Sequence, residues 1–504
     1  MAGPRLHHRV QDALVDEDRF MDQVRAEAAD LKREIRSGTF DNPQANVGLE
    51  YETYGVDEAD ASLKRVPRPL LDLIGFGKEL GLHNAELHTH PMPLSEYGLR
   101  ATRAELQARL HAAEATTTRT EGIQLVADGI WTIPPTGETA LDYLLATVER
   151  EGVLIGTNLS KSLRYHGMAN GAYQPRFEID APHVSLEGRT AGAESLITSI
   201  QPHYQVPSAG DLPVYFRYAL RIAGPLLALG VNSPFFPPEL YDEGATPEVL
   251  LSDGWAEHRI SVFETSLNPR YGPEKVTFPS DIERVEDAVD MIAEDPVLVP
   301  MEVTERGRYD DRFAHLRHKH GTCWRWVRPV FEGGSESSAN VRIEFRPLPN
   351  QPTVSDGIAF LALFAGLVKA LPHRDHPVAD LSWETARENF YTAMRDGLDA
   401  DFRWITAEGD ETTDHADIFP ELFDVALEGL AMREIPREVG ESTLRPLRER
   451  YERGVTPASW KRAQFEELVA SGADLTEAIY HTSREYVTRQ RETLIEGSFL
   501  DWLD

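Results

Sequence analysis

The chain has 504 residues, with 51 Lys plus Arg against 83 Asp plus Glu, which gives a formal net charge of −32 at pH 7. A charge of this sign and size argues against a sequence-independent nucleic-acid binder or a protein drawn to anionic lipid, because both need a positive surface. Hydrophobic residues make up 41% of the chain and aromatic residues 9%, so it can bury a sizeable core and disorder is not expected.

The basic residues are nearly all arginine, with 8 Lys against 43 Arg. An acidic, lysine-poor surface suits concentrated salt, where the Debye length falls to ~3 Å and repulsion between carboxylates is screened. The composition therefore predicts a halophilic protein, with an ordinary acidic cytosolic enzyme as the alternative. The single Cys323 excludes an intramolecular disulfide and a four-cysteine zinc site. With no apolar leader at its start and no run of 18 uncharged apolar residues, we expect a soluble, cytoplasmic protein.

The hydrophobic periodicity predicts an α+β protein in three parts. Residues 1–45 form an N-terminal helical segment, in which 8–36 is one charged amphipathic helix. Residues 46–371 form the catalytic domain, and residues 372–504 form an acidic helical region packed on it. Within the middle part we expect strands at 47–56, 84–91, 122–133, 182–186, 195–206, 324–331 and 340–347. The helices expected there are 70–80, 95–116, 212–229 with an internal Pro225, and 358–371.

Three of these strands concentrate polar residues on one face. The period of two places Glu50 and Glu52 together on one strand and surrounds His203 with glutamines on another. The third strand alternates Arg342, Glu344 and Arg346 with apolar residues. A solvated face of an antiparallel sheet would give the same alternation.

The residue types favour a metal site over a solvated face. Glu86, at the start of Glu86-Leu-His-Thr-His-Pro, adds a further carboxylate to those of Glu50, Glu52 and Glu344. Glutamate and histidine are ligands for hard or borderline divalent metals, and carboxylates gathered on one face repel one another unless cations neutralise them. We therefore predict bound Mg²⁺ or Mn²⁺, which in turn suggests a nucleotide. The sequence has no Walker A loop, kinase glycine loop or GxGxxG fingerprint, so ATP would bind through another architecture, such as the carboxylate-bearing antiparallel sheet of the glutamine synthetase-like fold.

A series of segments resembles the glutamate-cysteine ligase and carboxylate-amine ligase family, in family order over residues 46–491. The match that extends furthest is Ile343-Glu-Phe-Arg-Pro-Leu-Pro-Asn-Gln-Pro-Thr-Val-Ser-Asp, which is similar to the family's IEFRxxDxQPTxxD. The others are Gly48-Leu-Glu-Tyr-Glu (GxExE), Glu86-Leu-His-Thr-His-Pro (ExxTP with one insertion), Lys161-Ser-Leu-Arg-Tyr-His-Gly-Met (RYxxM), Pro202-His-Tyr, Asn232-Ser-Pro-Phe, Arg259-Ile-Ser-Val-Phe with Asn268-Pro-Arg, Arg387-Glu-Asn-Phe-Tyr-Thr-Ala-Met-Arg-Asp-Gly-Leu-Asp-Ala and Arg489-Gln-Arg.

This resemblance implies a glutamine synthetase-like α+β fold and ATP-dependent joining of a carboxylic acid to an amine through an acyl phosphate, most similar to the ligation of glutamate to cysteine. It implies that ATP and Mg²⁺ or Mn²⁺ bind, with Glu50, Glu52, Glu86, His203 and Glu344 as the metal ligands. Arg346 would be catalytic and bind the substrate carboxylate, since a guanidinium grips a carboxylate with two parallel bonds. The remaining implied contacts are Arg164 and Tyr165 with the substrate, Arg259 as a catalytic and nucleotide contact, and Asn232 and Ser233 with the nucleotide.

The chain departs from the family pattern at several points. These departures bear more on the identity of the substrates than on the mechanism. Pro349-Asn350 stands where the family often has Asp, and the ELHTHP segment carries two additional histidines, His88 and His90. These histidines support a rival, a metal-dependent hydrolase that uses Glu86, His88 and His90, because an H-x-H on a strand aims both rings at one metal. A guanidino phosphotransferase on the related fold and a non-catalytic nucleotide-binding member are further alternatives. The expected partners are a small-molecule acid and an amine, without nucleic acid or membrane, and a homo-oligomer is left open.

Overall fold

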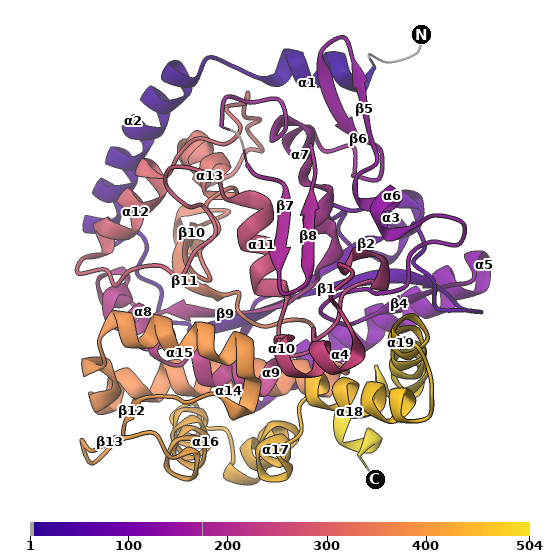
Figure 1. Ribbon diagram of the computed structural model, residues 1–504. Coiled ribbons are helices and arrows are strands. Elements are labelled where there is room, and N and C mark those ends of the chain that lie inside the picture. Colours follow the sequence, from indigo (N-terminus) through magenta and orange to yellow (C-terminus); the bar gives the residue numbers. More distant parts are fainter. Residues whose placement is uncertain (1–4, 174, 504) are drawn as a thin grey trace.

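An antiparallel sheet forms the centre of the computed structural model, which describes residues 5–173 and 175–503 (Figure 1). Its strands follow the order β10-β11-β9-β1-β2, and β3 and β4 also pair with the long, central β1. This sheet confirms the predicted α+β class. The strands are β1 (Asn46–Asp57), β2 (Asn84–His88), β3 (Met92–Pro93), β4 (Ile123–Val126), β9 (Ile200–Val206), β10 (Val327–Glu332) and β11 (Asn340–Phe345).

One face of the sheet is apolar and packs on the helix α14 (Val354–Arg374). Tyr51, Tyr204 and Ile343, which alternate with the polar residues along β1, β9 and β11, are fully buried. Helix α14 is long and apolar enough to cross a membrane, but 89% of its most apolar window is buried inside the protein. It is therefore the central helix of the core.

The helices that follow α14 in sequence cover the same side of the sheet and appear in orange to yellow in Figure 1. The predicted division between residues 371 and 372 falls inside α14, which packs both on the sheet and on α16 and α17. A single buried core thus joins the two predicted parts. The helices of this side are α4 (Glu96–Ala113), α5 (Arg119–Glu121), α8 (Leu212–Arg221), α9 (Ala223–Gly230), α10 (Pro247–Asp253), α15 (Trp383–Asp396), α16 (His415–Ala431), α17 (Arg437–Arg453), α18 (Pro457–Ala470) and α19 (Leu475–Thr493).

The opposite, polar face of the sheet is overlaid by short helices and hairpins from the middle of the chain, with the N-terminal helices outside them (Figure 1). These elements are α1 (Leu6–Ala13), α2 (Glu17–Arg36), α3 (Arg68–Ile74), α6 (Ala140–Leu144), α7 (Leu163–Gly167), α11 (Arg259–Leu267), α12 (Val285–Glu294) and α13 (Ala314–His320), with the hairpins β5–β6 (Thr147–Arg150, Val153–Gly156) and β7–β8 (Glu178–Ala181, Val184–Glu187). A further two-stranded sheet, β12–β13 (Trp404–Ile405, Glu411–Thr412), lies in the C-terminal part.

Several predicted elements differ from the structure at their ends. The single helix predicted over 8–36 is two helices, because Asp16 caps α2 by accepting the backbone N–H of Arg19 and so starts a new helix. The helix predicted over 212–229 breaks at Ile222, since Pro225 has no N–H to continue the bond ladder. The strand predicted over 195–206 starts at Ile200 instead, because residues 191–196 form a 3-10 turn.

Helices α14 and α16 approach each other closely at two glycines. A Cβ added to Gly429 would collide with the backbone carbonyl of Gly366. Gly429→Ala should therefore lower the free energy of unfolding by about 1–3 kcal/mol, since the two helices would have to separate. Denaturant unfolding at high salt measures this, with Gly210→Ala as a matched control. An added Cβ at Gly210 meets only the Ser208 hydroxyl, at 3.7 Å, so this control should change stability by less than about 0.5 kcal/mol. Equal effects of the two substitutions would contradict the close crossing.

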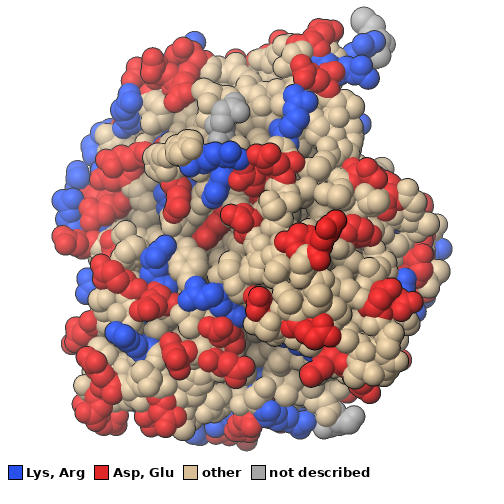
Figure 2. All heavy atoms as spheres, viewed as in Figure 1, with Lys and Arg blue, Asp and Glu red and all other residues tan. Residues whose placement is uncertain are grey.

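Acidic side chains are spread over the face shown in Figure 2, with lysine and arginine side chains among them. Repulsion within a net charge of −32 disfavours the compact chain, and salt screens this repulsion. We therefore expect the midpoint of thermal unfolding to fall steadily as KCl is lowered from molar to millimolar concentration. Sucrose, which does not screen charge, should not replace the salt. An unchanged midpoint in dilute buffer would remove the support for a halophilic protein.

Candidate active site

The register of the sheet brings the predicted carboxylates and histidine together on its polar face. Glu50 on β1 lies opposite His88 on β2, and Glu52 lies opposite Glu86. On the other side of β1, strand β9 places His203 opposite Glu344 of β11. Residues separated by nearly 300 positions in the chain thus become neighbours, and the period-two interpretation of these strands is confirmed.

Two groups of possible metal ligands form on this face and share Glu50. The first consists of Glu50, Glu86 and His88, and the second of Glu50, His203 and Glu344, with the ligand atoms of each group within 4.8 Å of one another. His203 Nε2 lies 3.3 Å from Glu50 Oε1 and His88 Nε2 lies 2.9 Å from Glu86 Oε2. His203 Nε2 is buried and makes no hydrogen bond to any residue that the structure describes. This buried nitrogen, which lies against the Glu50 carboxylate, fits a divalent cation.

The electrostatics of the first group indicate a position for positive charge. Although burial opposes protonation of His88, its bonds to Glu50 and Glu86 raise the pKa of this histidine to about 11. An imidazolium that is 56% exposed thus lies between two carboxylates, where a metal ion bound to the imidazole could replace the proton. His88 is therefore a candidate ligand of the active-site metal ions. The sequence alone suggested it as a ligand only for the rival hydrolase.

Two arginines hold Glu344 in its ionised form. Arg328 Nη2 donates to Glu344 Oε2 at 2.9 Å, and Arg346 Nη1 donates to Oε1 at 2.6 Å. Although burial raises the pKa of this carboxyl group, the charge of Arg328, followed by that of Arg346, lowers it to about 2. Glu344 is therefore available as an anionic ligand at neutral pH.

The larger of two neighbouring cavities opens on one side of Glu50, with a volume of about 670 Å³. This volume is within the range typical of small-molecule sites. The loop from β10 to β11, with Gly333 and Gly334, forms part of its wall, and Arg308 and Arg342 bring positive charge to it. Its other lining residues include Asn42, Gln44, Asn46, Gly48, His88, His203, Gln205, Glu332, Ser337, Ser338 and Asn340.

The smaller cavity, of about 230 Å³, lies on the other side of Glu50. Three of the predicted substrate contacts, Arg346, Arg164 and Tyr165, line it. Arg346 Nη1 donates to Gln201 Oε1 at 2.5 Å as well as to Glu344, while its buried Nε makes no hydrogen bond within the described residues. The remaining lining residues are Glu52, Glu79, Leu80, Glu86, Met168, Ala191, Glu194, Gln201, Phe263, Leu267, Gly321, Trp324 and Arg328.

This smaller cavity contains more acidic side chains than the sequence predicted. Burial and the neighbouring Glu79 raise the pKa of Glu52 to about 7, and burial and the neighbouring Glu86 raise the pKa of Glu79 to about 7. Burial and Glu79 likewise raise the pKa of Glu194 well above its ordinary value. Glu79 lies in an irregular segment and Glu194 in the short 3-10 turn over 191–196, so the alternation along strands could not have identified them. A cationic group, either a metal ion or an ammonium, would relieve the repulsion among these carboxylates.

Arg259, predicted as a catalytic and nucleotide contact, is buried at the start of α11 behind the smaller cavity. Its Nη1 donates to the backbone carbonyls of Arg346 and Pro347, at 3.1 and 3.4 Å, and its guanidinium lies 5.4 Å from the centre of the Trp326 ring. Burial lowers the pKa of Arg259 to about 10, which still leaves it charged at neutral pH. It therefore fixes the turn after β11 that carries Arg346.

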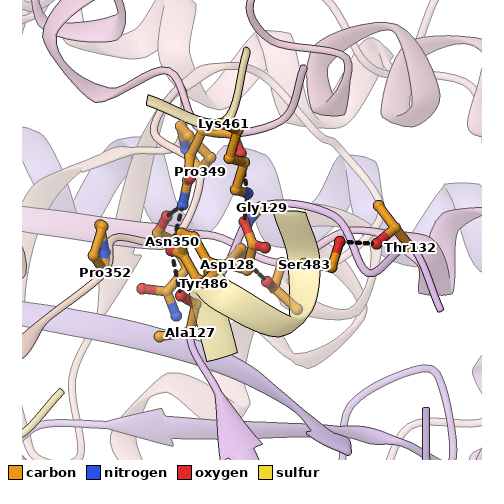
Figure 3. Close-up of polar contacts among 12 residues, drawn as sticks. Ala127, Asp128, Gly129, Thr132, Pro349, Asn350, Pro352, Lys461, Ser483 and Tyr486 are labelled. Carbon is orange, nitrogen blue, oxygen red and sulfur yellow. Dashed lines mark hydrogen bonds and ion pairs between the residues drawn. The ribbon is translucent and has the colours of Figure 1, made fainter. Parts of the chain in front are cut away.

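The structure does not bring Asn232 and Ser233 to either cavity. Both residues are fully buried. Asn232 donates to the backbone carbonyl of Asn350 and to the Tyr486 hydroxyl, at 2.8 and 3.0 Å. Figure 3 shows the surroundings of this contact, where Asn350 and Tyr486 from distant parts of the chain lie close together. These residues join the C-terminal helices to the loop after β11.

The triad of the rival hydrolase is not assembled either. Strand β2 ends at His88, so the period-two rule does not extend to His90. His90 Nδ1 lies 2.8 Å from Glu105 Oε1 on α4, away from Glu86 and His88. The two histidines of the H-x-H pair therefore have different partners.

Solved structures with similar folds share little sequence with this chain. A glutamate-cysteine ligase from Francisella tularensis in complex with AMP is 13% identical, over 90% of this chain and 91% of that one, with a TM-score of 0.49. A bifunctional glutathione synthetase from Pasteurella multocida is 13% identical, over 92% of this chain and 55% of that one, with a TM-score of 0.46. The complex of the ubiquitin-like protein Pup with its ligase PafA is 10% identical, over 85% of this chain and 70% of that one, with a TM-score of 0.37. No curated protein matches the sequence.

A sequence family gives a clear assignment. The model of glutamate-cysteine ligase family 2 matches residues 46–491, from the first residue of β1 almost to the end of α19. This range contains every residue of both cavities except Asn42 and Gln44. The chain belongs to glutamate-cysteine ligase family 2.

Proposed function

We propose that this protein is an ATP-dependent carboxylate-amine ligase that transfers a γ-glutamyl group to an amine, as a glutamate-cysteine ligase does. The observation that carries the proposal is the position of Glu50. This carboxylate belongs to both groups of candidate metal ligands and lines both cavities. A ligase needs such an arrangement, since the phosphate of one substrate has to meet the carboxylate of another at one charged point.

The two cavities suit different substrates. The larger cavity has the size for a nucleotide, and Arg308 and Arg342 can pair with phosphate. The smaller cavity combines Arg346 and Arg164 with the carboxylates of Glu79 and Glu194, which suits an amino acid with its opposite charges. The metal ligands Glu50, Glu52, Glu86, His88, His203 and Glu344 would lie between the two substrates.

In the proposed reaction, Arg346 holds the carboxylate of the acid substrate in line with the γ-phosphorus of ATP. Attack by the carboxylate oxygen gives an acyl phosphate and ADP, and the amine then displaces phosphate to form the amide. Divalent metal ions, when bound, would neutralise the phosphate charge and act as Lewis acids. The chain itself supplies positioning and charge, and this scheme needs no nucleophilic side chain.

The role of Arg346 can be tested by separating the kinetic constants of the two substrates. Arg346→Ala should raise the KM for the acid by about 10- to 100-fold, which corresponds to the loss of a charge-assisted hydrogen bond, and should change the KM for ATP much less. Arg346→Lys keeps a positive charge beside Glu344 and should recover part of the loss. The exposed Arg100, which pairs with Glu96 on its own helix, gives a matched control in Arg100→Ala. An unchanged KM for the acid in Arg346→Ala would refute the assignment.

A further inference from the structure

A second cluster of possible metal ligands lies on the N-terminal helix, outside the active site. His7 and His8 on α1 face Glu151, which occupies the turn of the β5–β6 hairpin. The φ angle of Glu151 is 51°, in the left-handed region, which is uncommon for a residue other than glycine, asparagine or aspartate. Glu151 thus occupies a turn position unusual for its type while both histidines lie against its carboxylate.

The distances from the two histidines to the Glu151 carboxylate are close to those between neighbouring ligand atoms of a tetrahedral metal site. His7 Nε2 lies 3.6 Å from Glu151 Oε1, and His8 Nε2 lies 3.2 Å from Oε2. In a tetrahedral zinc site the bonds to nitrogen and oxygen are about 2.0–2.1 Å, so neighbouring donor atoms are about 3.3 Å apart. The two imidazole rings, with centroids 4.2 Å apart, can both reach one ion.

The burial of His7 distinguishes this cluster from an ordinary surface ion pair. The His7 side chain is 7% exposed, and its Nε2 makes no hydrogen bond to any residue that the structure describes. A buried imidazole nitrogen whose nearest partner is a carboxylate oxygen at 3.6 Å, with no hydrogen bond, carries an energetic cost that a bound cation would relieve. His8 is 45% exposed and Glu151 66% exposed, so one side of the cluster is open to water.

We propose that His7, His8 and Glu151 bind a zinc-like divalent transition metal ion, with water as the fourth ligand. Two histidines, one carboxylate and an open position suit Zn²⁺ better than Mg²⁺, which prefers oxygen ligands alone. The ion fastens α1 to the β5–β6 hairpin. Helix α1 also packs on α7, which carries Arg164 and Tyr165 to the wall of the smaller cavity, so the metal stabilises one wall of the active site.

Zinc binding can be separated from binding at the active site by working in a Glu50→Ala background, because Glu50 is common to both active-site groups. Equilibrium dialysis with Zn²⁺ in excess Mg²⁺ should find one tightly bound ion per chain. Adding His7→Ala and His8→Ala should weaken that binding by at least about 100-fold and abolish the rise in melting temperature that Zn²⁺ produces. Co²⁺ in place of Zn²⁺ should give the intense visible absorption of a tetrahedral site in the Glu50→Ala variant. This absorption should be lost when His7→Ala and His8→Ala are added.

The control and a conservative variant complete the test. His111 lies between Glu114 and Glu496, at 3.7 and 3.6 Å, but has no second imidazole, so His111→Ala should leave zinc binding unchanged. Glu151→Gln removes only the negative charge of Glu151 and should also weaken zinc binding. This variant keeps the proposal testable if the double histidine variant does not fold. Unchanged zinc stoichiometry and affinity in Glu151→Gln, or in a folded double histidine variant, would overturn the proposal.

Discussion

Replacing Glu50 with alanine should reduce ATP-dependent amide formation by about 10³-fold or more, which is the scale of losing charge stabilisation in a phosphoryl-transfer site. The reason is structural, since Glu50 is the only ligand common to the two active-site groups among the described residues. The substitution should also weaken Mn²⁺ binding, measured by titration in the absence of nucleotide. Loss of either Glu86 or Glu344 should affect one group, whereas loss of Glu50 affects both.

Glu105 provides the matched control for Glu50. It also pairs with a histidine, because His90 Nδ1 lies 2.8 Å from its Oε1, but it belongs to no metal group among the described residues. Glu105→Ala should therefore change activity only a few-fold, as expected for the loss of a partly exposed pair. Full activity in a folded Glu50→Ala variant would contradict the metal assignment.

Arg450→Ala should lower the free energy of unfolding by about 3–5 kcal/mol, because it leaves a buried carboxylate without its partner. Arg450, on α17, is completely buried. Its Nη2 lies 2.9 Å from Asp356 Oδ1 at the start of α14, and its Nη1 donates to Gln351 Oε1 at 2.7 Å. The guanidinium also lies 5.0 Å from the centre of the Phe499 ring. One side chain thus connects the core helix, the loop after β11 and the C-terminus.

A neighbour on the same helix gives the control for Arg450. Arg448 lies 3.6 Å from Asp424 and 5.3 Å from the centre of the Phe423 ring, but is partly exposed. Arg448→Ala should cost no more than about 1 kcal/mol. Denaturant unfolding of both variants at high salt measures the difference. Similar losses in the two variants would show that the buried pair does not hold the helices together.

The family-like segment 343–356 illustrates what a sequence can predict. Its first half alternates polar and apolar residues, and this alternation correctly placed Glu344 and Arg346 on the polar face. Its second half serves the fold. Gln351 Nε2 donates to the carbonyl of Gly230 at 2.8 Å, Thr353 caps α14, and Asp356 pairs with Arg450. No periodicity distinguishes such buried polar contacts from substrate contacts.

The same limit explains the positions of Asn232 and of Glu79. Asn232 resembles a nucleotide contact in sequence, yet lies in a buried network with Asn350, Tyr486 and Lys461, whose Nζ donates to the Asn232 carbonyl at 2.7 Å. Glu79 follows a short helix in an irregular loop, yet lines the smaller cavity. Alternation along a strand can be predicted from sequence, whereas contacts made by loops depend on the packing of the whole chain.

We propose above that this protein joins a carboxylic acid to an amine with the energy of ATP. The most direct measurement is the release of ADP and phosphate at high salt with Mg²⁺ or Mn²⁺, starting with glutamate and cysteine. We expect that ADP, phosphate and amide form in equal amounts, and that all three require both the acid and the amine. Release of ADP without free phosphate would instead indicate a phosphotransferase, and amide hydrolysis without ATP a hydrolase. Normal ATP binding with no turnover of any acid and amine pair would contradict the claim outright.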